Sequence, residues 1–110
     1  ASVHLAKVLL KVRERDRSIR AVMNVKYDEA VERAVKSLNL RFVKVGPQDR
    51  ADDDSIAEEI SRLYSPGTDV VFHIGGLGLE PVTYVFGKTP LDVVRKVLDI
   101  AKVYAEMKRE

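Results

Sequence analysis

The residues from His73 to Pro81 are the densest candidate for ligand chemistry in the chain. Three glycines, Gly75, Gly76 and Gly78, fall within four positions. Closely spaced glycines let successive backbone N–H groups point into one concavity, which suits an anion such as a phosphate group. The segment lacks the lysine and the serine or threonine of a P-loop, and its spacing differs from a dinucleotide-binding fingerprint. A tight β-turn with positive φ angles explains the same glycines, and the sequence leaves both explanations open.

Four polar side chains near predicted element ends are further candidates. His73 closes a buried strand and could donate to a phosphate or a ring nitrogen, or its ring could be satisfied by the backbone. His4 lies beside Ser2 in the first turn of a helix, where free N–H groups either bind an anion or are simply capped. Glu80 could bind a cationic ligand group, or it could be a surface carboxylate.

The run Asp52–Asp54 invites interpretation as a metal site, but acidic residues are also favoured before a helix by its dipole. Divalent ions are usually held by ligands that converge from several segments. We therefore expect no metal site in this chain. No Ser/His/Asp or Cys/His constellation is apparent, and neither histidine has an obvious carboxylate to orient it.

Hydrophobic periodicity predicts four helices and four strands. Strands are expected over 21–25, 42–45, 69–74 and 82–86. Helices are expected over 2–15, from Asp28 to residue 38, from a Ser55–Glu58 capping box to residue 64, and from a Thr89 cap onward. The predicted inner face of the last helix is Leu91, Val94, Val97, Leu98, Ala101 and Tyr104.

The resulting order α-β-α-β-α-β-β-α predicts a single three-layer α/β domain over residues 1–110. Strands that alternate with helices favour a mainly parallel sheet, and the closely linked last pair predicts one antiparallel strand. Such domains bind ligands beyond the carboxyl ends of their strands. That rule places Asn24, the loop 46–52 and the glycine segment at one site.

Composition excludes several classes of protein. The 110 residues carry 19 basic and 17 acidic side chains, and a dedicated nucleic-acid binder usually has a larger excess of positive charge. No apolar run approaches the roughly 20 residues of a membrane span. Without cysteine, disulfides and thiolate zinc sites are excluded. We expect a cytoplasmic domain that contacts neither membrane nor nucleic acid directly.

Two parts of the chain together resemble the ThiN domain of thiamine-phosphate synthases. The stretches 2–10 and 19–27 resemble the middle of that domain. The glycine–Glu–Pro stretch 75–81, the ending Val85–Gly87 and then Asp92–Val94 resemble its carboxyl end, in the same order and spacing. The ligand-binding residues that we expect on this basis, together with the residue patterns, are Ser2, His4, Asn24, His73, Gly75, Gly76, Leu77, Gly78 and Glu80.

The resemblance implies an α/β domain that handles thiamine phosphate or its phosphorylated precursors. Catalytic members join hydroxymethylpyrimidine diphosphate to thiazole phosphate and release pyrophosphate, and a catalytic role would imply His4 as a catalytic residue and Mg²⁺ as a cofactor. Related domains follow a helix-turn-helix module and sense thiamine phosphate to regulate genes. We expect the chain to belong to a longer protein in either case.

Departures from the catalytic pattern favour the sensor. Ile74 and Leu79 stand where synthases tend to carry charges, and the pair Thr83–Tyr84 is more like regulators. The chain also begins after a segment that holds an arginine in the enzymes, although His4 matches their histidine. The leading hypothesis is the homodimeric sensor domain of a transcriptional regulator. The alternatives are a synthase domain, with no further cofactor implied, and a pure dimerisation module.

Overall fold

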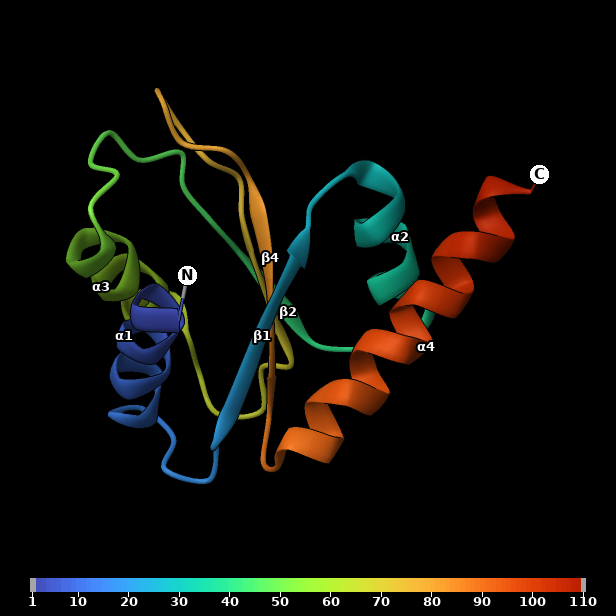
Figure 1. Cartoon of the computed structure of the whole chain (residues 1–110), viewed down its shortest axis with the longest axis horizontal. Coiled ribbons are helices and arrows are strands. Elements are labelled where there is room, and N and C mark those ends of the chain that lie inside the picture. Colours follow the sequence, from blue (N-terminus) through green and yellow to red (C-terminus); the bar gives the residue numbers. More distant parts are fainter. Residues whose placement is uncertain (1, 110) are drawn as a thin grey trace.

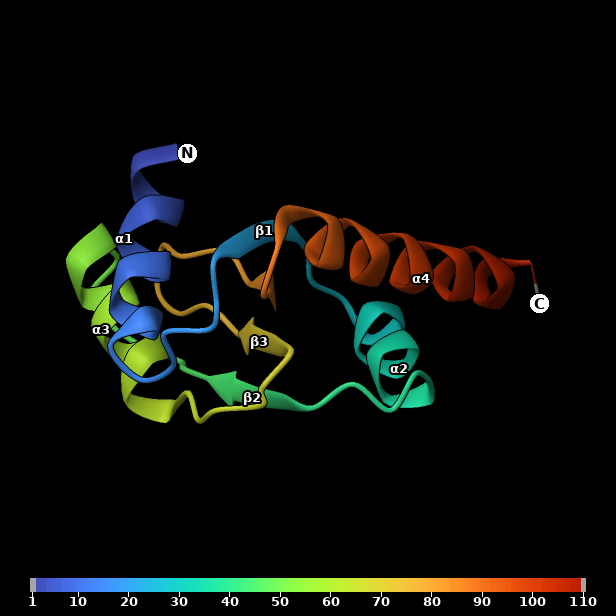
Figure 2. The ribbon, with the colours of Figure 1, turned by 90° about the horizontal axis from the view of Figure 1, so that it is seen from below.

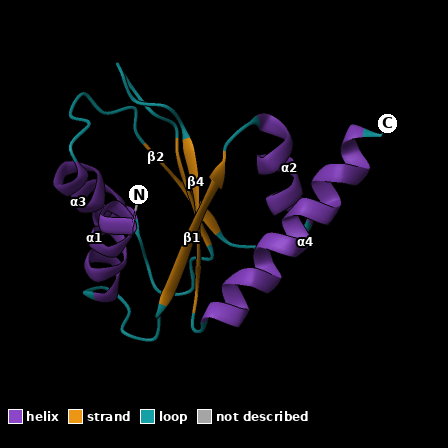
Figure 3. Cartoon of the chain, in the orientation of Figure 1, coloured by secondary structure: helices purple, strands orange, loops and turns teal. Residues whose placement is uncertain are grey.

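The computed structural model describes residues 2–109, and its helices cover both faces of one sheet (Figure 1). The elements are α1 (Ser2–Arg13), β1 (Ala21–Lys26), α2 (Glu29–Ser37), β2 (Phe42–Val45), α3 (Asp53–Leu63), β3 (Val70–His73), β4 (Val82–Gly87) and α4 (Pro90–Lys108). Helices α1 and α3 lie on one face, and α2 and α4 lie on the other (Figure 3). The predicted element order and the three-layer α/β architecture are confirmed. No helix in this described range is long and apolar enough to cross a membrane.

The pairing of the strands differs from the expectation of a mainly parallel sheet. The strand order is β1–β4–β3–β2. Only β2 and β3 pair in parallel, whereas β4 pairs antiparallel with both β1 and β3. One strand does run against the other three, as expected, but it lies inside the sheet. Because an interior reversed strand contributes two of the three pairings, the sheet is mostly antiparallel and the prediction was wrong.

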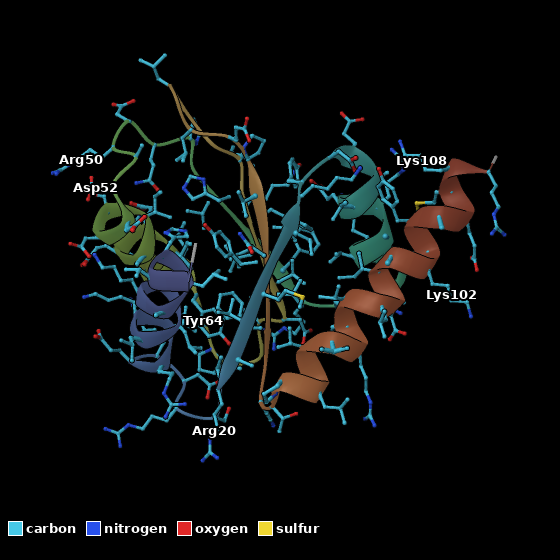
Figure 4. All side chains as sticks on the ribbon, in the orientation of Figure 1. Arg20, Arg50, Asp52, Tyr64, Lys102 and Lys108 are labelled. Atoms are coloured by element: carbon cyan, nitrogen blue, oxygen red, sulfur yellow. The ribbon has the colours of Figure 1, made fainter. Side chains whose placement is uncertain are left out.

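Each face of the sheet has its own hydrophobic core. Along β3 the side chains alternate, so that Val71 packs with α1 and α3 while Val70 and Phe72 pack with α2 and α4. All four residues of β3 are buried, which confirms the prediction of a strand covered on both faces. Figure 2, turned by 90°, shows α1 beside α3 and α2 beside α4 on opposite sides of the strands. Tyr64, at the end of α3, lies between its helix layer and the sheet (Figure 4).

The last helix begins as predicted but turns a different face inward. Thr89 caps it by accepting a hydrogen bond from the Asp92 amide, and Pro90 occupies the first turn. Among the residues predicted to face inward, Val97 and Tyr104 do pack against the core. The remaining residues of that predicted face are exposed: Leu91, Val94, Leu98 and Ala101. The helix has two apolar stripes, and periodicity alone does not tell which of them meets the sheet.

The acidic run Asp52–Asp54 forms the start of α3. Asp52, rather than the predicted Ser55, is the N-cap, and its Oδ2 accepts hydrogen bonds from the Ser55 amide at 3.0 Å and hydroxyl at 2.9 Å. Asp54 then pairs with Lys7 of α1 at 3.0 Å. The helix dipole and the pairing between helices thus account for Asp52 and Asp54.

The loop that leads into α3 is attached to the glycine segment. The Gln48 amide donates to the Gly75 carbonyl at 3.1 Å, and a Cβ on Gly76 would overlap the Gln48 carbonyl. Gly76 and Leu79 exchange two backbone hydrogen bonds of 3.1 Å around a turn whose second central residue, Gly78, has a φ of 71°. These glycines thus allow a tight turn and a close backbone contact, and through that contact they fix where α3 begins.

Buried Glu32 joins α2 to the sheet on the opposite face. Its carboxylate accepts a 2.6 Å hydrogen bond from the Tyr27 hydroxyl and pairs with Lys44 at 3.0 Å and Lys36 at 3.1 Å. The hydrogen bond from Tyr27 is the main reason that the pKa of Glu32 falls to about 2. Burial alone would raise this pKa, and the two lysines help to lower it. The same hydrogen bond raises the pKa of Tyr27 to about 12.

Replacing Gly76 by Ala should destabilise the protein by about 2–3 kcal/mol, because the new methyl group must push the Gln48 backbone away. Gly78→Ala is the matched control, since a Cβ there meets nothing within 4 Å and costs only the left-handed φ, about 1–2 kcal/mol. Chemical denaturation measures both changes. Equal losses for the two variants would contradict the proposed contact.

Glu32→Ala should lower the free energy of unfolding at pH 7 by about 1–3 kcal/mol, because charged hydrogen bonds are lost. The pKa of Glu32 is lower in the folded protein than its ordinary value of 4.5. This stabilisation is therefore complete above pH 4.5 and is lost as the pH falls toward 2. Urea titrations across that range should show the difference between variant and parent narrowing, whereas exposed Glu29→Gln should have little effect at any pH.

Candidate functional site

A cleft of about 310 Å³ opens between the α1–α3 layer and the sheet, near the carboxyl ends of β1, β2 and β3. It is lined by His4, Asn24, Ala51, Asp53, Ile56, His73, Leu79, Glu80, Val82 and Tyr84. Helices α1 and α3 stand side by side in Figures 1 and 2, so residues from the starts of both helices reach one wall of this cleft. A second cleft of about 140 Å³ lies under α4 and has an almost wholly apolar lining.

The structure brings together some of the expected ligand-binding residues and separates others. His4, Asn24, His73 and Glu80 all line the cleft. The glycine residues of the predicted anion cradle are not among the residues that line it, and Leu77, at the tip of the turn, is 90% exposed. The side chain of Ser2 lies outside the described part of the structure.

His4 is held between two partners from other elements. Its Nδ1 lies 3.0 Å from Asp53 Oδ1 at the start of α3, and its Nε2 lies 2.7 Å from the Tyr84 hydroxyl on β4. The expectation that neither histidine has an orienting carboxylate was therefore wrong. Asp53 is far from His4 in the sequence, and only the packing of α1 against α3 brings the two residues together.

The hydrogen-bond partners select one tautomer of a neutral His4 ring. A carboxylate can only accept, so the proton of the neutral imidazole lies on Nδ1, and Nε2 accepts from Tyr84. Burial, with a smaller contribution from the negative charge of Asp53, raises the pKa of Tyr84 to about 12. Tyr84 therefore stays protonated at neutral pH. The three residues form a directed chain in which Tyr84 donates to His4 and His4 donates to Asp53.

His73 has a different environment from His4. Its Nδ1 accepts from the Gly75 amide at 3.0 Å, and its Nε2 lies 2.6 Å from Gln48 Oε1. Burial lowers the pKa of this ring, which is only 2% exposed. Both nitrogens of a neutral ring are thus engaged within the protein. This arrangement favours a histidine that holds the loop and the turn together over one that binds ligand.

The amides of the glycine segment are also largely engaged within the protein. Gly75 donates to His73, while Gly76 and Leu79 donate to each other's carbonyls. A backbone cradle for an anion needs unpaired N–H groups that converge. The hydrogen bonds therefore support the β-turn explanation of this segment. Its contribution to the cleft comes from the residues that follow the turn, Leu79 and Glu80.

The described starts of α1 and α3 differ in charge. The first turn of α1 contains no acidic residue, whereas α3 begins with Asp53 and Asp54. Asp53 reaches across to His4, so the imidazole on this wall of the cleft lies beside a carboxylate.

Asn24 and Tyr84 complete the sheet side of the cleft. They are paired across β1 and β4, and Tyr84 is in turn paired with Val71 of β3. The alternation of β4 predicts that Tyr84 shares a face with Val82 and Phe86. That pattern could identify the face of Tyr84 but not its partner. Tyr84 and Asp53 are the polar residues of this site that the sequence did not reveal.

Known proteins match this chain over nearly its full length. The family model described as thiamine-phosphate synthase ThiN matches residues 1–99. A bifunctional thiamine biosynthesis protein ThiDN of Methanocaldococcus jannaschii is 33% identical over 94% of the chain. A thiamine-phosphate synthase ThiN of Methanothermobacter thermautotrophicus is 26% identical over 98% of the chain. The chain spans only 26% of the first relative and 62% of the second.

Solved structures show the same fold. The C-terminal domain of protein MJ0236 superposes with a TM-score of 0.77 at 28% identity, over 94% of this chain and 59% of that one. The C-terminal domain of a phosphomethylpyrimidine kinase has a TM-score of 0.67 at 22% identity, over 88% of this chain and 60% of that one. These structures show the fold, and the family model over residues 1–99 shows that the chain belongs to the ThiN family of thiamine-phosphate synthases.

Proposed function

We propose that this domain catalyses thiamine phosphate formation from hydroxymethylpyrimidine diphosphate and thiazole phosphate. The observation that carries the proposal is the hydrogen-bonded chain Asp53–His4–Tyr84 in the cleft. His4 stands at the position of the histidine in the catalytic members that the sequence resembles. The relatives are named as biosynthesis proteins, which favours the synthase over the sensor that we expected first.

Of the two apolar departures from the synthase pattern, Leu79 has a structural explanation and the side chain of Ile74 has none. Leu79 packs against the core of the α1–α3 face and also lines the cleft. The Ile74 amide donates to the Val45 carbonyl, so this position continues the parallel pairing of β2 and β3. In the described part of the chain, the lining of the cleft holds no lysine or arginine. Positive charge for phosphate recognition must then come from a protonated His4 or from a cation bound together with the substrate.

In the proposed reaction, the thiazole ring nitrogen forms a bond to the methylene carbon of the pyrimidine substrate. The bond from that carbon to the pyrophosphate oxygen breaks, and pyrophosphate leaves with the electron pair. The attacking nitrogen carries no proton, so the reaction needs no base there. Catalysis depends on orienting two phosphorylated molecules and on stabilising the departing charge.

His4 has the geometry for the second task. When its Nε2 takes up a proton, the imidazolium remains paired with Asp53, whose negative charge stabilises it. The Nε2–H group then donates to the Tyr84 oxygen, and the Tyr84 hydroxyl hydrogen is released to donate to the leaving pyrophosphate. Removal of either donor should slow pyrophosphate departure more than it weakens substrate binding.

The cleft also has groups that fit Mg²⁺. Mg²⁺ is usually held by one or two carboxylates together with substrate phosphates, and Asp53 and Glu80 both line the cleft. No cluster of three or more His, Cys, Asp or Glu side chains occurs in residues 2–109, so such an ion would depend on the substrate for most of its ligands. When bound, it would neutralise charge on the pyrophosphate.

His4→Ala should reduce turnover by about 10²- to 10⁴-fold, the usual contribution of a positioned proton donor. The measurement is thiamine phosphate formed from the two precursors under saturating conditions. Leu10→Ala, on the exposed side of the same helix, is the matched control and should retain activity. Unchanged turnover in folded His4→Ala would refute the assigned role. If the parent protein binds thiamine monophosphate in calorimetry but forms none, the sensor is the better function.

Tyr84→Phe should lower kcat by about 10- to 100-fold, because one hydrogen bond to a charged group contributes about 1.5–3 kcal/mol. The ring remains, so packing on the sheet and the melting temperature should change little. Steady-state kinetics and thermal unfolding measured on the same preparation separate the two effects. A matching fall in kcat and stability would indicate that Tyr84 only supports the fold.

A further inference from the structure

We infer that the side-chain amide of Asn24 recognises the aminopyrimidine edge of the diphosphate substrate. The inference rests on the proposed function, because it concerns the same cleft and names the group that selects one of its two substrates. It begins from the position of Asn24. This residue is exposed on β1, lines the cleft, and lies directly opposite Tyr84 in the register with β4.

The register sets Asn24 close to the reactive part of the site. Side chains opposite each other in an antiparallel pair have Cβ atoms about 4.5–5.5 Å apart. Tyr84 in turn holds His4 by the 2.7 Å hydrogen bond. Asn24 from β1 and His4 from α1 therefore both flank Tyr84. A molecule lying over Tyr84 can meet the amide with one part and the imidazole with another.

The hydrogen-bonding groups of an amide match those of hydroxymethylpyrimidine diphosphate, whose ring is a 4-aminopyrimidine. The amide presents an acceptor oxygen beside a donor nitrogen, and a 4-aminopyrimidine presents a donor amino group beside an acceptor ring nitrogen. Two parallel hydrogen bonds result, in the way that asparagine reads adenine in DNA. The thiazole phosphate has no such pair. Its ring nitrogen is the attacking atom, and a hydrogen bond to that nitrogen would oppose the reaction.

The surroundings of Asn24 suit a flat ring. Ile56, Leu79 and Val82 supply carbon surface to the same cleft. The aromatic side chain of Tyr84 lies on the sheet side. Apolar walls with a few well-placed polar groups are typical of small-molecule sites. A pyrimidine held at Asn24 can then extend its diphosphate toward His4.

Calorimetry with each substrate alone tests the inference in the whole protein. Asn24→Ala should weaken binding of hydroxymethylpyrimidine diphosphate by about 10- to 100-fold, the discrimination of one bidentate pair. Binding of thiazole phosphate should stay within about twofold, because no donor–acceptor pair is lost there. Asn24→Asp should resemble Asn24→Ala, since a carboxylate cannot donate. Met23→Ala is the matched control, because Met23 is exposed on the same strand and faces the other side of the sheet.

A second ligand identifies the edge that is recognised. The same diphosphate without its 4-amino group should bind the parent protein weakly, and Asn24→Ala should bind both compounds alike. Equal loss of affinity for inorganic pyrophosphate in Asn24→Ala would instead show a phosphate contact and overturn the inference. So would equal weakening of thiazole phosphate, or a parent protein that binds no pyrimidine diphosphate. If pyrimidine binding depends on Asn24 but no thiamine phosphate forms, the inference stands and the proposed synthase activity fails.

Discussion

The interior position of β4 determines how the parts of the site meet. This strand pairs antiparallel with β1 on one side and β3 on the other, and it therefore sets the register of Asn24 against Tyr84. The Tyr84 hydroxyl is in turn hydrogen-bonded to His4 of α1, a helix that covers this face of the sheet. A sheet in which β4 did not pair with β1 would separate Asn24 from the tyrosine. The topology that the sequence did not predict is thus the feature on which the cleft depends.

The sequence predicted well those features that depend on neighbouring residues. The caps Asp28 and Thr89 are confirmed, because a side chain that accepts from an amide three positions later is a local arrangement. The placement of β4 beside β1 joins segments from opposite ends of the chain, and no short-range pattern reports it. The choice between the two apolar stripes of α4 failed for the same reason, since only the sheet decides which stripe is buried.

The sequence likewise predicted some residues of the candidate site and missed others. The rule that ligands bind beyond strand ends pointed to Asn24, His73 and Glu80, all of which line the cleft. The closely spaced glycines indicated that another group lies close to this backbone. In the structure that group is the backbone of Gln48, which contacts Gly76, and not a ligand. The sequence does not identify Asp53 as the carboxylate that orients His4, because an acidic residue at the start of a helix is already expected there.

The charge balance of the cleft bears on how such a domain handles phosphates. Its lining holds two carboxylates, Asp53 and Glu80, and no lysine or arginine. A diphosphate entering this cleft must therefore be balanced by a positive charge on His4 or by a divalent ion held with the carboxylates. The 3.0 Å contact with Nδ1 places the Asp53 carboxylate beside any positive charge on the His4 ring. The carboxylate that repels the substrate's charge thus also stabilises the imidazolium that offsets it, which suits a site where negative charge grows on a leaving group.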